Sequence, residues 1–178
     1  MRGILTVTMT TAKTNSKQGV DLVITRIIDA PVELVWKAWS EPEQVKRWWG
    51  PQHYTSPTCT IDFQEGGKYI FCMRAPQDQG GRDEYSAGQY LKIVPFEILE
   101  FTQFMSDENG FKVNPVEMGL SPDFPDEVRT SVTFKRIRPD MTELSITEYG
   151  WTVNPMFVYA LAGMHQSIDK LSTSLKSF

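Results

Sequence analysis

The stretch that decides the fold is residues 154–178, NPMFVYALAGMHQSIDKLSTSLKSF. Its large apolar residues recur at alternating steps of four and three: Phe157, Leu161, Met164, Ile168, Leu171, Leu175 and Phe178. This spacing places them on one stripe of an α-helix. Asn154 is a favourable N-cap, and Pro155 suits the first helical position, where no backbone N–H is needed. At about 1.5 Å per residue the helix spans roughly 36 Å, so its stripe needs a partner of comparable size.

The chain before this helix is dominated by β-strand patterns. Strands are expected at residues 20–29, 59–64, 69–73, 85–94, 98–105, 128–138 and 142–149. Two short helices, at 31–39 and 41–49, are expected directly after the first strand. We therefore predict an α+β domain, in which a curved antiparallel sheet of about seven strands surrounds the long C-terminal helix. The alternative is a coiled coil, for which three heptads of the stripe suffice.

The first hairpin fixes the expected state of the two cysteines. A three-residue loop sets Phe63 opposite Tyr69 and leaves Cys59 and Cys72 on opposite faces. In the alternative two-residue-loop register the cysteines become diagonal neighbours, roughly 7–8 Å apart. Neither register forms a disulfide, so we expect free thiols, the state typical of the cytoplasm.

Bulk composition limits the function classes. The chain has 178 residues with 10 Phe, 6 Tyr and 5 Trp, a net charge of −4 and a pI near 5.2. This charge argues against nucleic acid or an anionic membrane as the main partner, and no apolar run approaches a membrane span. Residues 1–19 are predicted to be a flexible tail without signal-peptide character, with Met9 as a possible internal start. A single domain is expected over residues 20–178 in a cytoplasmic protein.

One long connection interrupts the strand pattern. Residues 106–127 contain three prolines and six acidic residues against one lysine. Loops of this length within a compact domain are usually functional or disordered.

The segment ITRIIDAPVELVWKAWSEPEQVKRWWGP, residues 24–51, resembles the opening signature of the family of activator-of-heat-shock-protein-90-ATPase homologues. The Glu65-Gly66-Gly67 turn, the Gly88-x-Tyr90 strand and the long C-terminal helix also match, so the resemblance covers roughly residues 20–178. It implies the START-like helix-grip fold, with a deep apolar cavity between sheet and helix. The acidic segment 106–127 is longer than the resemblance implies.

The resemblance and the strand parity together suggest which residues line such a cavity. They are Trp49, Phe71, Met73, Phe134, Ile146, Glu148, Phe157, Leu161, Met164 and His165. The alternative is that the apolar members form a solid core. Glu148 is the ionisable residue that parity directs inward, although a bulge would turn it outward. Of the adjacent Trp48 and Trp49, either one lines the cavity mouth or both are core.

Three functions fit this architecture. The first is binding of a small hydrophobic molecule, such as a lipid, polyketide or aromatic metabolite, in the cavity. The second is a cyclase or hydratase that uses Glu148, His165 or a tyrosine as general acid–base. The third is a stress-response module that contacts a chaperone through its outer surface. No cofactor is expected, and no cluster of His, Cys and carboxylates has metal-binding spacing.

Overall fold

The computed structural model describes residues 19–177. Residues 1–18 of the tail predicted at 1–19, the possible start at Met9 and the last stripe residue, Phe178, lie outside this range. The strands are β1 (Val20–Ile28), β2 (Cys59–Ile61), β3 (Lys68–Arg74), β4 (Asp83–Val94), β5 (Ile98–Ser106), β6 (Val128–Arg138) and β7 (Met141–Trp151). The helices are α1 (Val32–Ser40), α2 (Pro42–Val45) and α3 (Pro155–Ser174), with 3-10 turns η1 (Gln77–Gln79) and η2 (Leu175–Ser177).

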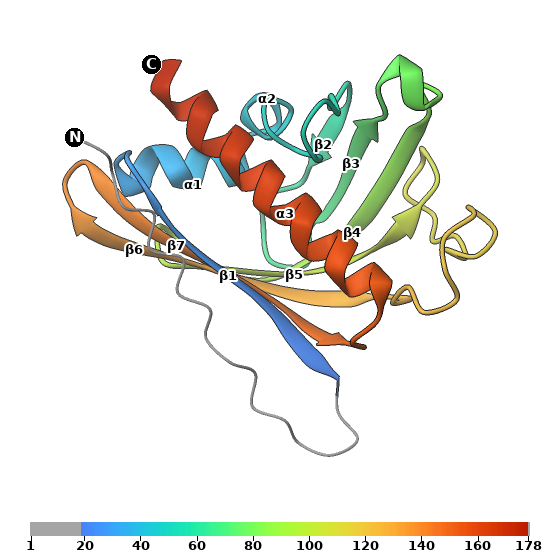
Figure 1. Ribbon diagram of the computed structural model, residues 1–178. Helices are drawn as coiled ribbons and strands as arrows, with labels where there is room; N and C mark the ends of the chain where they lie inside the picture. The colour runs from blue at the N-terminus through green and yellow to red at the C-terminus, as the bar shows by residue number, and fades with distance from the viewer. Residues whose placement is uncertain (1–18, 178) are drawn as a thin grey trace.

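All seven described strands form one antiparallel sheet in the order β1-β7-β6-β5-β4-β3-β2. The first strand therefore pairs with the last, and the sheet curves around α3, which crosses its concave face (Figure 1). Side chains along β6 and β7 alternate between buried and exposed, as expected for a sheet with one face toward water. This arrangement is the predicted α+β helix-grip architecture.

Helix α3 begins and packs as its sequence indicates. The Asn154 side chain accepts a hydrogen bond from the Phe157 backbone N–H at 2.9 Å. The second half of the stripe, Ile168, Leu171 and Leu175, is buried against the sheet and α1. The first half is only partly buried. The stripe therefore packs within this chain instead of forming a coiled coil.

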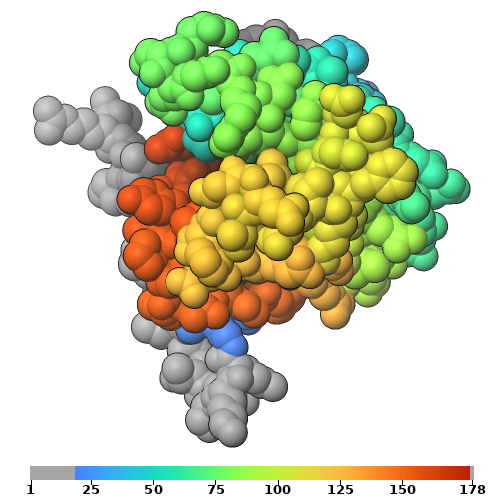
Figure 2. Space-filling model, turned by 90° about the vertical axis from the view of Figure 1, so that its right-hand side faces the viewer, coloured from blue at the N-terminus to red at the C-terminus, as the bar shows by residue number. Residues whose placement is uncertain are grey.

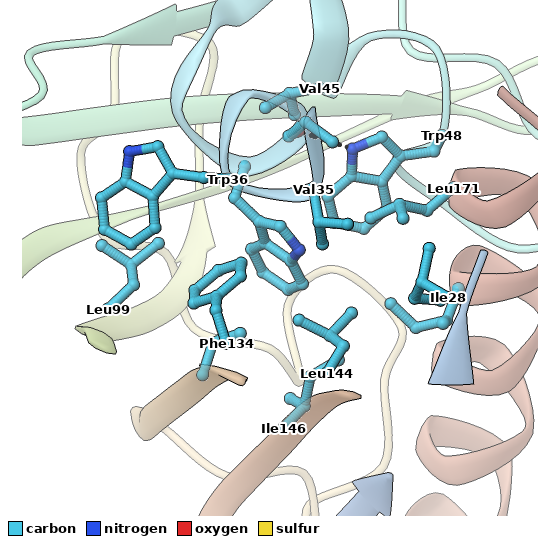
Figure 3. Packing of buried hydrophobic residues seen from close by; sticks show 14 of the residues in the cluster. Ile28, Val35, Trp36, Val45, Trp48, Leu99, Phe134, Leu144, Ile146 and Leu171 are labelled. Carbon is cyan, nitrogen blue, oxygen red and sulfur yellow. Dashed lines mark hydrogen bonds between the residues drawn. The ribbon is translucent and has the colours of Figure 1, made fainter. Parts of the chain in front are cut away.

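The main core fills one end of the grip. Side chains from α1, the sheet and the second half of α3 point toward one another there (Figure 3). The ring of Phe134 lies 5.0 Å from that of Trp36 and 6.4 Å from that of Trp39, both in edge-on arrangements. Trp48 is fully buried, and its indole N–H donates to the Ala38 carbonyl at 2.8 Å. These contacts fix α1 and the residues after α2 against the sheet.

Two local predictions are wrong. The β2–β3 register pairs Ile61 with Tyr69, not Phe63 with Tyr69. Phe63 leaves the ladder because its ring packs edge-on against those of Trp36 and Tyr90, at 5.8 and 5.1 Å. The second helix ends at Val45, and a turn replaces the expected continuation to residue 49. Both cysteines are free thiols, as predicted.

The packing of Leu171 generates a stability prediction. Leu171→Ala removes a fully buried side chain from the contact between α3 and the sheet, so it lowers the free energy of unfolding by about 2–5 kcal/mol in urea denaturation. Val158→Ala on the same helix, at a position that is 60% exposed, changes it by less than about 0.5 kcal/mol. Equal effects of the two substitutions would contradict the orientation of α3.

Candidate functional site

A cavity of about 420 Å³ lies between the first half of α3 and the inner face of the sheet. This volume falls within the range of small-molecule sites, about 300–1,000 Å³. Tyr159, which is 70% exposed, stands at its mouth. The cavity occupies the end of the grip opposite the aromatic core, where the stripe of α3 is only partly buried.

Apolar side chains from the sheet form most of its floor. Met73 of β3, Met105 of β5, Val128 of β6 and Trp151 of β7 line it. Polar side chains interrupt this floor at Glu84, Ser86, Gln103 and Glu148. The result is an apolar surface with a few polar groups, which is the usual composition of a ligand pocket.

The helix presents small residues to the cavity. Ala160, Gly163 and Ser167 line it from α3, and their spacing of three and four puts them on one face of the helix. Larger residues at these positions would fill the space between helix and sheet. The cavity therefore exists because this face is small, while the neighbouring stripe supplies the packing.

The segment 49–54 forms a second wall and is held by α3. Lys170 donates from Nζ to the carbonyl oxygens of Gly50 and Tyr54, at 3.0 and 2.8 Å, and more distantly to those of Trp49 and Pro51. The Gln166 side chain accepts from the backbone N–H of residue 52 at 3.0 Å. The three N–H donors of this ammonium group are thus shared among four carbonyl oxygens and hold this wall against the helix.

The acidic segment 106–127 supplies the third wall. Leu120, Phe124 and Pro125 line the cavity, and the Phe124 ring packs edge-on against Trp151, with centroids 5.9 Å apart. The Asn154 side-chain amide donates to the carbonyl of residue 123 at 3.4 Å. Figure 2 shows this segment, in yellow, beside the orange-red start of α3. The segment is thus part of the candidate site.

Glu148 is the ionisable group buried most deeply in this site. Its residue is 7% exposed, and its Oε2 accepts from the Trp151 indole N–H at 3.0 Å. Burial raises the pKa of the Glu148 carboxyl to about 7, while the Trp151 hydrogen bond opposes the shift. Glu148 is therefore on the buried face of β7, as strand parity predicts, and it lines the cavity.

The structure brings together four of the ten residues predicted to line the cavity. Trp49, Met73, Glu148 and Met164 surround it. Three others, Phe71, Phe134 and Ile146, belong to the core, and Phe157 and Leu161 pack beside Leu22 and Trp151. Both adjacent tryptophans belong to the buried core, and Trp49 also borders the cavity.

His165 lies apart from the cavity. Its Nδ1 is 2.9 Å from a guanidinium nitrogen of Arg26 on β1, and Arg26 also pairs with Asp169 at 2.8 Å. Burial and the Arg26 charge lower the pKa of His165. Glu148 and His165, the two groups proposed for acid–base chemistry, therefore have separate partners. Glu148 is hydrogen-bonded to Trp151, and His165 to Arg26.

Sequence reasoning missed the small face of α3 and both loop walls. A signal for the first was present, because Ala160, Gly163 and Ser167 recur at helical spacing beside the apolar stripe. The walls at 49–54 and 120–125 depend on long-range contacts that no local pattern encodes. Within residues 19–177, no group of three or more His, Cys, Asp or Glu side chains is placed to hold a metal ion. No helix in that range is long and apolar enough to span a bilayer.

The raised pKa of Glu148 predicts how stability depends on pH. In the unfolded chain this carboxyl titrates near 4.5, so between pH 4.5 and 7 the folded protein holds more protons than the unfolded one. Its contribution to stability is fully present below pH 4.5 and is lost as the pH rises through 7. When the pH is raised from 5 to 8, the free energy of unfolding of the wild-type protein should therefore fall by about 2–3 kcal/mol relative to that of Glu148→Gln. A pH-independent difference would show that the carboxyl is solvated.

The Lys170 contacts generate a second prediction. Lys170→Met removes the ammonium donors of these carbonyls and should cost about 1–3 kcal/mol of stability. Hydrogen exchange of the amide at residue 52 should also accelerate, because segment 49–54 is released. Lys176→Met, at an exposed position near the end of the same helix, serves as the control. Unchanged exchange in Lys170→Met would mean that the wall is held by other contacts.

Comparison with solved structures identifies the architecture. A protein from Arthrobacter aurescens superposes with a TM-score of 0.72 and 22% identity over 96% of this chain and 94% of its own. A protein of Silicibacter pomeroyi described as AHSA1 superposes with a TM-score of 0.69 and 18% identity over 88% of this chain and 97% of its own. A protein from Nitrosomonas europaea superposes with a TM-score of 0.68 and 19% identity over 92% of this chain and 97% of its own. At these identities the matches show a shared fold.

Sequence comparison then identifies the family. No curated protein matches the chain. The family model described as Activator of Hsp90 ATPase homolog 1-like protein matches residues 29–176, which include both early helices, all described strands after β1 and the whole of α3. The chain belongs to the family of Activator of Hsp90 ATPase homolog 1-like proteins and has its helix-grip fold.

Proposed function

We propose that this protein binds a small, largely apolar molecule in the cavity under α3. The observation that supports this proposal is a 420 Å³ space with mostly apolar walls beside the packed aromatic core. Filling such a space with apolar atoms removes hydrophobic surface from water and gains dispersion contacts. The helix-grip fold of the family is consistent with this role.

The walls suggest the kind of molecule. Aromatic rings border the cavity at Trp49, Phe104, Phe124 and Trp151, and flexible methionines adapt to guests of different shape. The ligand is therefore an aliphatic or aromatic hydrocarbon body of small-molecule size. The free cysteines support the prediction of a cytoplasmic protein. An interaction with a chaperone stays a prediction, for which a pull-down is the test.

A cavity-filling variant tests the proposal. The neutral fluorescent probe N-phenyl-1-naphthylamine should bind to the wild-type protein with enhanced emission. Ala160→Phe places a ring in the cavity and should weaken probe binding at least tenfold without unfolding the domain. Val158→Phe adds the same ring on the exposed side of α3 and should bind the probe like wild type. Equal binding by both variants, or no binding by wild type, would overturn the proposal.

A further inference from the structure

The two charged residues that line the cavity are both acidic. Glu84 and Glu148 line it, and no Lys, Arg or His does so among the described residues. Its third wall continues into Asp123, Asp126 and Glu127, with Lys112 paired to the last two at 2.7 and 3.6 Å. A ligand entering here passes acidic groups and meets carboxylates inside.

Glu148 retains an unused acceptor. Its Oε2 bonds to Trp151, but its Oε1 accepts no hydrogen bond from any residue in 19–177. This oxygen is not among the fully buried polar atoms that lack a partner, so it is open to the cavity, and a guest that supplies an N–H or O–H there forms a hydrogen bond to it. The Trp151 bond fixes the carboxyl, so this acceptor position is preformed.

The surroundings of Glu148 offer no competing cation. Leu22 of β1 and Thr130 of β6 stand opposite it in the two ladders. The titratable residues that line the cavity with Glu148 are Tyr54, Glu84, Tyr85 and Tyr159, and Glu84 pairs with Arg82 at 3.1 Å. Tyr69 donates its hydroxyl to the Thr102 carbonyl at 2.6 Å. From α3 the cavity receives apolar Met156, together with other uncharged residues. Lys170 is held by segment 49–54, and Arg26 by Asp169 and His165.

We propose that the cavity selects hydrophobic amines, with the ammonium group donating to Glu148 and the hydrocarbon body lying between the floor and α3. This inference rests on the proposed function and specifies its ligand class. A carboxylate ligand of the same size would bring its charge next to the buried Glu148 carboxyl, and no Lys, Arg or His lines the cavity among the described residues, so the site rejects fatty-acid anions.

Three probes of equal chain length test the selectivity. Decylamine, 1-decanol and decanoate compete with N-phenyl-1-naphthylamine at pH 8, where the amine is mainly cationic. Decylamine should bind at least tenfold more tightly than decanoate, with 1-decanol between them. In Glu148→Gln the ratio of decylamine to 1-decanol affinity should fall to about one. Asp140→Asn, which changes the net charge equally at an exposed distant turn, should keep the wild-type ratio.

The pH dependence supplies an independent readout. A carboxyl with a pKa of about 7 must lose its proton to meet an ammonium group, so decylamine affinity should fall about tenfold from pH 8 to pH 6 while 1-decanol affinity stays constant. Equal affinities for the three probes, tighter binding of decanoate, or a ratio unaffected by Glu148→Gln would overturn the amine proposal but leave the cavity function intact. Failure of all probes, including N-phenyl-1-naphthylamine, would overturn the cavity function itself.

Discussion

The structure depends on how α3 is held against the sheet. Ile168, Leu171 and Leu175 in its second half are buried among α1 and the sheet, and this packing sets the position of the whole helix. The first half of the helix continues across the concave face (Figure 1) and is only partly buried there, beside Leu22 and Trp151. Ala160 and Gly163 do not fill the space below. Tight packing at one end thus creates the cavity at the other.

Two polar attachments convert this space into a bounded site. Lys170 binds the carbonyls of segment 49–54, and Asn154 connects the start of α3 to segment 106–127. Both walls are therefore attached to the same helix that forms the roof. Motion of α3 would move all three boundaries together, so entry of a guest and opening of the walls are mechanically linked.

Much of the fold was predictable, and the site only in part. Periods of two and 3.6 placed the seven strands and α3, because side-chain burial enforces those periods. Parity also placed Glu148 inside. The apolar stripe of α3 was less informative about the cavity. Its residues Phe157 and Leu161 pack beside Leu22 and Trp151, and the neighbouring face of small residues lines the cavity. The departure of Phe63 from its ladder and the closure of both loops depend on distant rings and carbonyls, which a local pattern does not contain.

The most direct test of the central claim uses the methionine methyl groups as reporters. Met73, Met105, Met156 and Met164 border the cavity from the sheet and α3, whereas Met118 and Met141 do not. In methyl-labelled protein titrated with 1-decanol, an apolar guest under α3 should shift the signals of the first four and leave that of Met141 unchanged. Shifts confined to Met118 and Met141, or no shifts at saturating 1-decanol, would contradict the account.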